Sequence, residues 1–339
     1  MRAGDDLEVR LFRPGDEQAS LDLFNRVFSV DPHTGEPRSM GHWRWRFLDN
    51  PVGAVHYALA FNAEGEAVAQ FGGIPVRTAI RGERRTCVQL ADHMVDPRYR
   101  RGLKRQGIFA KTAMEMAKTY GGSGPDEDSI FFGYPVPANW RIGQRVLRYR
   151  FVRLMNFLIW SVPPKRDWAV RSDIELRNVT RFGEEVEDLW AAWRDRLTVA
   201  TERTSAYLNW RFADCPDTHY ELIEARDARG DLRGFIVLRA GGLHDDTAML
   251  MEWLSHPRDD ATRLALLEEA CRFVDRTEGV HRLATWYPES CPEFAWLHSL
   301  GFLIEASPRI LSARCYDPTI TIDLLRRSWY MTPGDIDFL

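Results

Sequence analysis

At 339 residues the chain is long for one domain, and its length favours two. A net charge of −4 argues against a nucleic-acid-binding surface along the whole chain. The five cysteines are scattered, no C-x-x-C is present, and the N-terminus lacks an apolar leader, so we expect a cytoplasmic protein with reduced thiols and no metal site. The most apolar run, residues 151–162, is too short to span a membrane.

Residues 6–28 read as a strand, a turn at 14–16 and a helix. A W-R-F segment follows at 45–47, and His56 then opens a pair of antiparallel strands joined by a glycine turn. Arginines interleaved with aromatic residues occur in single-strand nucleic-acid binders, but the same letters recur at 210–212. The recurrence favours a structural element.

Residues 87–118 are the stretch around which the chain is organised. They read as an alternating strand that ends at Pro97, a basic loop and an amphipathic helix that begins near Ile108. The loop holds five cationic side chains: Arg98, Arg100, Arg101, Lys104 and Arg105. A strand that feeds such a loop into a helix can bind phosphate, because unpaired N–H groups and the positive helix end meet the anion there. A plain basic surface loop fits the same spacing, and no P-loop or dinucleotide fingerprint is present.

The apolar segment 129–134 predicts a strand parallel to the one at 87–96, since a helix connects the two. The remaining strands are short and follow one another through turns, which predicts antiparallel neighbours. The expected fold class is therefore α/β, in the α+β sense of a mixed and mostly antiparallel sheet flanked by helices.

The chain repeats this plan. Trp45 and Trp210 are 165 residues apart, His56 and His219 are 163 apart, and Pro97 and Pro257 are 160 apart. Similar segments that recur in the same order, at a separation that decreases smoothly from 165 to 160 residues, predict a tandem duplication. We expect a first domain over 1–162, a second over 163–320 after a proline-rich linker, and a tail over 321–339.

The end of the strand, the basic loop and the start of the helix within 87–118, which we call the phosphate cradle, resemble the acyl-CoA pyrophosphate loop of the GCN5-related N-acetyltransferase (GNAT) superfamily. The family pattern is V-x-P-x-[YF]-R-x-[RQ]-G-[IL]-[GA]. With 101–105 treated as a longer loop, the matching residues are Val95, Pro97, Tyr99, Arg100, Gln106, Gly107 and Ile108. Phe109 stands where the family has Gly or Ala. W-R-[WF] followed by N-P is similar to the tandem two-domain bacterial type. The resemblance covers most of 6–155, and 173–303 by element order alone.

The resemblance implies two tandem GNAT-like domains and acetyl-CoA or another acyl-CoA as a substrate, with no metal. The residues that it places at the acyl-CoA are Met94, Val95, Arg100, Arg105, Gln106, Gly107, Ile108, Phe109 and Ala110. It also places Asn139 beside the pantetheine arm, although an N-cap role explains that residue equally well.

In this family the strand before the cradle splays from its neighbour and offers the catalytic base, which points to Asp92 or His93. Adjacent strand residues face opposite sides, so at most one of them faces the cleft. The tyrosine that often serves as the general acid in this family is missing in both copies, where Gln144 and Leu297 stand instead. Tyr134 is the substitute that we name, with Tyr149 and Tyr99 as alternatives.

We therefore expect an N-acyltransferase that acts on a primary amine of a small metabolite such as an amino sugar, with the active site in the first copy. The second copy carries Asp259 and Asp260 where phosphates would bind, so we expect it to have lost the acyl-CoA site and to cover the cleft, shape the acceptor pocket or form a homodimer. The alternatives are another thioester reaction, with a carrier-protein donor, an oxygen acceptor or decarboxylation, and a binding module without catalysis.

Overall fold

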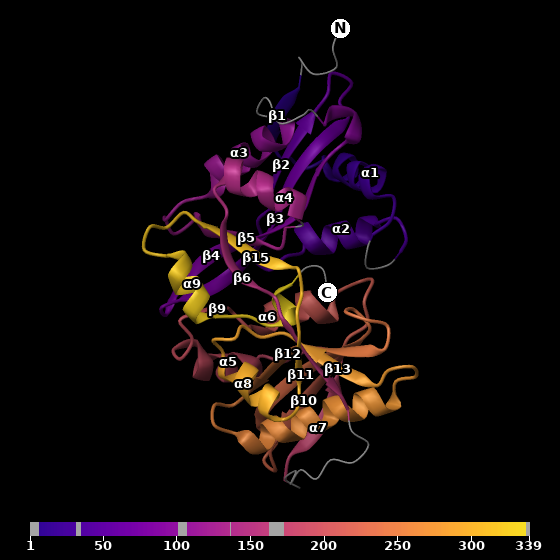
Figure 1. The fold of residues 1–339 in the computed structure, drawn as a ribbon, viewed down its shortest axis with the longest axis vertical. Coiled ribbons are helices and arrows are strands. Elements are labelled where there is room, and N and C mark those ends of the chain that lie inside the picture. The colour runs from indigo at the N-terminus through magenta and orange to yellow at the C-terminus, as the bar shows by residue number, and fades with distance from the viewer. Residues whose placement is uncertain (1–6, 32–34, 101–106, 136, 163–172, 337–339) are drawn as a thin grey trace. The chain divides into compact units, whose positions relative to one another are not determined.

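The computed structural model describes residues 7–31, 35–100, 107–135, 137–162 and 173–336, and these fall into two compact units (Figure 1). Unit 1 comprises 1–78, 85–154 and 309–325. Unit 2 comprises 79–84, 155–308 and 326–339.

Unit 1 is built around one mixed sheet. Its elements in chain order are β1 (Glu8–Leu11), α1 (Glu17–Phe28), α2 (Met40–Phe47), β2 (His56–Phe61), β3 (Ala67–Ile80), β4 (Glu83–Val95), the 3-10 turn η1 (Pro97–Tyr99), α3 (Ile108–Tyr120), β5 (Asp128–Gly133), α4 (Pro137–Ile142), the π-helical turn η2 (Gly143–Leu147), β6 (Arg150–Leu154), β15 (Ile310–Cys315) and the start of α9 (Ile322–Ser328). The strand order is β1-β2-β3-β4-β5-β15-β6. The β4–β5 pair is parallel, as the helix between them predicted, and the β1–β2, β2–β3, β5–β15 and β15–β6 pairs are antiparallel.

Unit 2 follows the same plan. Its elements are β7 (Phe157–Ser161), β8 (Glu175–Val179), α5 (Glu185–Arg194), β9 (Val199–Thr201), α6 (Ser205–Leu208), η3 (Asn209–Ala213), β10 (Glu221–Arg226), β11 (Leu232–Ala240), β12 (Thr247–Ser255), α7 (Asp260–Arg276), β13 (Arg282–Thr285), α8 (Pro292–Ser299), β14 (Leu303–Glu305), β16 (Trp329–Tyr330) and η4 (Pro333–Asp335). Its main sheet runs β14-β7-β13-β12-β11-β10-β8, and only its β12–β13 pair is parallel. The expected fold class, two tandem mixed and mostly antiparallel sheets, is confirmed.

Each sheet holds a strand that the predicted boundaries at 162 and 320 would assign to the other copy. Strand β15, from beyond residue 308, lies between β5 and β6 in the sheet of unit 1. Strand β7, from before residue 162, lies between β13 and β14 in the sheet of unit 2. The boundaries at 162 and 320 therefore stay predictions of where the sequence repeats meet, while the compact units follow a different division.

The two faces of the sheet in unit 1 carry different side chains, because neighbouring strand residues point to opposite sides. Tyr57 and Gln70 face α1, where the Ser20 hydroxyl lies 3.1 Å from the Tyr57 hydroxyl and 3.2 Å from the Gln70 amide oxygen. Ala58 and Phe71 face α3 and pack in one core cluster with its buried residues. This division decides which neighbours Asp92 and His93 meet.

Both W-R-F segments are structural. All six side chains are buried: Trp45, Arg46, Phe47, Trp210, Arg211 and Phe212. In unit 2 the Arg211 guanidinium donates to the Tyr220 hydroxyl at 3.2 Å and to the backbone carbonyl of Gly334 at 3.0 Å. Separately, no helix among the described residues has the length and apolar character needed to cross a membrane.

Candidate functional site

The parallel strands β4 and β5 separate before β4 ends. Their pairing runs from Thr86 opposite Asp128 to Gln89 opposite Phe132, whereas β4 continues to Val95. Within the described residues, the last six residues of β4 therefore have no β5 partner. The N–H groups that face this side therefore have no acceptor in β5 and could donate to a ligand.

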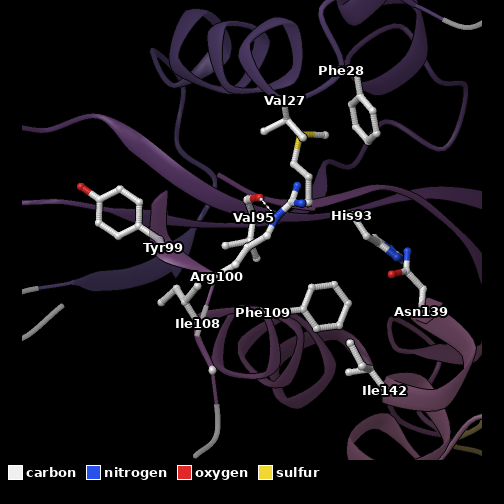
Figure 2. Close-up of a pocket in the computed structure, with 12 residues that line it drawn as sticks. Val27, Phe28, His93, Val95, Tyr99, Arg100, Ile108, Phe109, Asn139 and Ile142 are labelled. Carbon is white, nitrogen blue, oxygen red and sulfur yellow. Dashed lines mark hydrogen bonds between the residues drawn. The ribbon is translucent and has the colours of Figure 1, made fainter. Parts of the chain in front are cut away.

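A cavity of about 390 Å³ lies at this separation, within unit 1 (Figure 2). The residues that line it are Val27, Phe28, His93, Met94, Val95, Tyr99, Arg100, Gly107, Ile108, Phe109, Asn139 and Ile142. The structure thus brings together nine of the residues that the sequence singled out: His93, Met94, Val95, Tyr99, Arg100, Gly107, Ile108, Phe109 and Asn139. His93 and Asn139 are both drawn on the side of the cavity away from Tyr99 (Figure 2).

The open N-terminus of α3 forms one wall of the cavity. Gly107 is the N-cap, no side chain caps the helix, and its first turn holds no acidic residue. Ala110 is the first residue whose N–H bonds to the Gly107 carbonyl, at 3.0 Å, so the N–H groups of 107–109 have no partner within the helix. These groups and the positive helix end suit an anion such as a phosphate.

Arg100 lies at the same end of the cavity. Its Nε donates to the Val95 carbonyl at 2.9 Å, which holds the base of the basic loop against the end of β4. Arg105 and Gln106, which we predicted to contact the acyl-CoA, lie outside the described residues. Ala110, also predicted, is buried in α3 and is not among the lining residues.

His93 is held as a neutral imidazole. Its Nε2 lies 3.1 Å from the Gly72 carbonyl, which can only accept, so Nε2 carries the proton and Nδ1 is left with a lone pair. The ring stacks on Phe71 with centroids 3.8 Å apart, and the Phe109 ring meets it edge-on at 6.4 Å. Burial lowers the pKa of His93 from 6.5 to about 4. At neutral pH the side chain is therefore a proton acceptor.

Asp92 lies on the opposite face, and its carboxylate is committed to Arg38. The Arg38 guanidinium also binds Asp31 at 2.6 Å and lies 3.5 Å from the centre of the Phe24 ring. Burial would raise the pKa of Asp92, but the charges of Arg38 and Arg46 outweigh it and hold the pKa below its usual value. Asp92 is not among the lining residues, and its φ of 52° marks a left-handed residue inside β4. This arrangement suits a residue that shapes the strand.

Tyr134 lies just after β5, half-buried, with its ring 6.5 Å from that of Phe132. It does not line the cavity, so its predicted role as the acid stays a prediction. Sequence reasoning missed Val27, Phe28 and Ile142. The first two end a helix that the sequence did predict, but no pattern indicates which helix end faces the cleft.

The second unit has the same layout without the open helix end. The N-cap of α7 is Asp259, whose carboxylate accepts from the Thr262 N–H at 3.1 Å and from Arg233 at 2.9 Å. Trp253, 160 residues after His93, lies with its ring 5.4 Å from that of Trp296. A carboxylate thus takes the place that a phosphate would need.

The C-terminal segment is part of unit 2. Arg203 is fully buried and binds Glu252 at 3.2 Å and Asp335 at 2.5 Å. The backbone carbonyl of Ile336 accepts from Arg211 at 2.9 Å. The tail that we placed at 321–339 is therefore anchored by ion pairs and hydrogen bonds as far as residue 336.

Comparison with known proteins agrees with this fold. Residues 8–124 match the family model described as an acetyltransferase (GNAT) domain. A probable N-acyltransferase from Enterococcus faecalis V583 has a similar structure, with 12% identity over 92% of this chain and 73% of the other and a TM-score of 0.66. The Saccharomyces cerevisiae N-myristoyltransferase with bound myristoyl-CoA shares 13% identity over 95% and 88% of the two chains, with a TM-score of 0.57. A tandem GNAT protein from the clavulanic acid biosynthesis pathway shares 16% identity over 92% and 99%, with a TM-score of 0.52. Among curated proteins none matches this sequence.

Proposed function

We propose that this chain, a tandem member of the GNAT superfamily, transfers an acyl group from acyl-CoA to a primary amine of a small metabolite in the cytoplasm. The observation that carries the proposal is one cavity in unit 1 that joins the uncapped N-terminus of α3 to the unpaired end of β4. The yeast N-myristoyltransferase, with its bound myristoyl-CoA, supports a thioester donor for this fold.

The donor's phosphates bind at the start of α3. The N–H groups of 107–109 point to the cavity end that Arg100 also lines, so they neutralise the pyrophosphate together. The thioester lies beside Met94 and Val95, where backbone N–H groups without a β5 partner donate to its carbonyl oxygen. That hydrogen bond strengthens as the oxygen gains negative charge in the transition state.

His93 accepts the proton of the amine. Its Nδ1 carries a lone pair because Nε2–H is held by the Gly72 carbonyl. The amine nitrogen then attacks the thioester carbon, the carbon–sulfur bond breaks, and CoA leaves as a thiolate that takes up a proton. Asp92 stays paired with Arg38 throughout and keeps the bend in β4 in place.

An amine acceptor is proposed because the neutral imidazole of His93 can accept the proton that the amine nitrogen loses as it attacks the thioester carbon. Transfer to a hydroxyl oxygen would use the same residues and is an alternative. An amino sugar remains one candidate for the amine acceptor, and its hydroxyl groups would need polar partners in the site. A carrier-protein donor, a decarboxylation or a role in binding alone are the other readings. Absence of acyl-CoA binding would favour the carrier-protein donor or the role in binding alone.

Titration calorimetry with acetyl-CoA and CoA should show saturable binding at one site per chain. Gly107→Leu should weaken that binding at least about tenfold, because a Cβ at Gly107 has nothing within 4 Å and a longer side chain would extend into the cavity. Gly107→Ala is the matched control, with an ordinary φ of −67° and a cost of at most about 1 kcal/mol in stability. Equal affinities in wild type and Gly107→Leu would rule out the cradle, and two sites would show that unit 2 also binds.

A further inference from the structure

The last turn of α1 gives the cavity an apolar wall that the proposed chemistry does not use. Val27 and Phe28 lie across the cavity from Phe109 and Ile142 (Figure 2). Phe28 is 46% exposed, although a large aromatic side chain is usually covered by other residues. An exposed ring that lines a cavity is suited to contact with an apolar ligand.

This helix end is fixed, so the exposure of Phe28 does not come from a frayed terminus. Arg26 binds the Asp96 carboxylate at 2.9 Å and the Ala67 carbonyl at 2.7 Å, which ties the last turn of α1 to the end of β4 and the start of β3. The Phe24 ring packs against that of Phe28 with centroids 5.0 Å apart. The wall is therefore in place before any ligand arrives.

The polar groups of the cavity lie elsewhere, and several are already engaged. Tyr99 accepts a hydrogen bond from Asn62 at 3.1 Å, Arg100 donates to the Val95 carbonyl, and His93 Nε2 is held by Gly72. The α1 wall adds no polar side chain to these. A sugar hydroxyl against it would lose its water partners without replacement, whereas a hydrocarbon would lose none.

We infer that Val27 and Phe28 bind a hydrocarbon chain on the acyl group of the donor, so that the preferred thioester carries an acyl group longer than acetyl. The inference rests on the proposed function, because the chain must extend from a thioester that lies beside β4. Phe28 then acts as a specificity-determining residue and contributes little to the binding of CoA itself.

The test is calorimetric titration of the full chain with CoA, acetyl-CoA, butanoyl-CoA and octanoyl-CoA. In wild type the affinity should rise with chain length, by up to about fourfold per buried methylene. Phe28→Ala should flatten that rise and leave the affinity for CoA unchanged. Val30→Ala is the matched control, because Val30 is 45% exposed in the same segment but does not line the cavity, so it should behave as wild type.

Two results would overturn the inference: equal affinity of wild type for all the acyl donors, or the same rise with chain length in Phe28→Ala as in wild type. Failure of the proposed function looks different, since CoA itself would then not bind to wild type. Because Phe28 is exposed, its replacement leaves the core intact, and a circular dichroism spectrum checks this directly.

Discussion

Replacing His93 by Gln should lower turnover by a factor of about 10² to 10⁴ while donor affinity and thermal stability stay close to wild type. A glutamine amide can still donate to the Gly72 carbonyl, as the imidazole Nε2 does at 3.1 Å, but it has no basic nitrogen. The variant therefore removes the proton acceptor and keeps the hydrogen bond that holds the side chain. Single-turnover kinetics on a preformed donor complex measure the step concerned.

The pH dependence gives an independent check on His93. Its pKa is lowered from 6.5 to about 4, so in the folded protein the active neutral form persists well below pH 6.5. Turnover per bound donor should fall with an acid limb near pH 4 in wild type, and this limb should be absent in His93→Gln. A limb near pH 6.5 would mean that another group is the base.

The same shift affects stability. Between pH 6.5 and about 4 the unfolded chain binds more protons at His93 than the folded chain does. The free energy of unfolding therefore increases with pH across this window, and its His93 contribution is complete above pH 6.5 and lost as the pH falls towards 4. His93→Gln should remove that part of the slope.

The strand, glycine and helix of the proposed phosphate site could be predicted because they are adjacent in the chain. The strand that ends at Pro97, the glycine and the helix from Ile108 follow one another, and local periodicity is enough to place them. The resemblance to tandem GNAT proteins, drawn from the same stretch and from the repeated W-R-F, is confirmed. Local patterns and the repeated order of elements were therefore sufficient to predict most of the fold.

The strand exchange could not be predicted, because strand partners are set by contacts distant in sequence. β7 and β15 are short, and nothing in their residues tells which of two similar sheets each one joins. A duplicated chain makes this ambiguity worse, since each copy offers the other an equivalent edge. Only the register of the pairs resolves it.

The sequence could also not tell which of Asp92 and His93 lines the cavity. Alternation indicated that at most one of them faces the cleft, and the choice depends on Arg38, 54 residues away in sequence, which binds the Asp92 carboxylate. The left-handed backbone at Asp92 has no sequence signal beyond the tolerance of aspartate for that conformation. Phe109, a departure from the family pattern, lines the cavity and meets the rings of Phe71 and His93 edge-on, at 5.6 and 6.4 Å.

Unit 2 repeats the buried arginine of unit 1, and this arginine has a structural role in each unit. Arg38 and Arg203 each precede the N-cap of a helix, Ser39 or Thr204, and the two N-caps have nearly identical backbone angles. Each arginine binds a carboxylate on the strand before the cradle position, Asp92 in unit 1 and Glu252 in unit 2. In unit 2 the C-terminal segment supplies the second carboxylate, which ties that segment into the core.

Arg203→Ala should therefore destabilise unit 2 by about 3 to 5 kcal/mol, because it leaves the carboxylates of Glu252 and Asp335 buried without a counter-charge. The control is Arg177→Ala, which breaks an exposed pair with Glu175 at 2.6 Å and should leave the unfolding midpoint close to that of wild type. Urea unfolding followed by tryptophan fluorescence compares the two. Equal midpoints for both variants would contradict a structural role for this network.

The loss of stability in Arg203→Ala, measured as the difference in free energy of unfolding from wild type, should also depend on pH. Burial already raises the pKa of Glu252 against the opposing charge of Arg203, and removal of that charge raises it further. The folded variant then binds more protons than its unfolded chain, so its stability falls as the pH rises above the unfolded pKa of a carboxylate. We expect the gap to wild type to be smallest in acid and to widen towards neutral pH. A gap that is constant with pH would mean that lost packing, rather than unpaired charge, destabilises the variant.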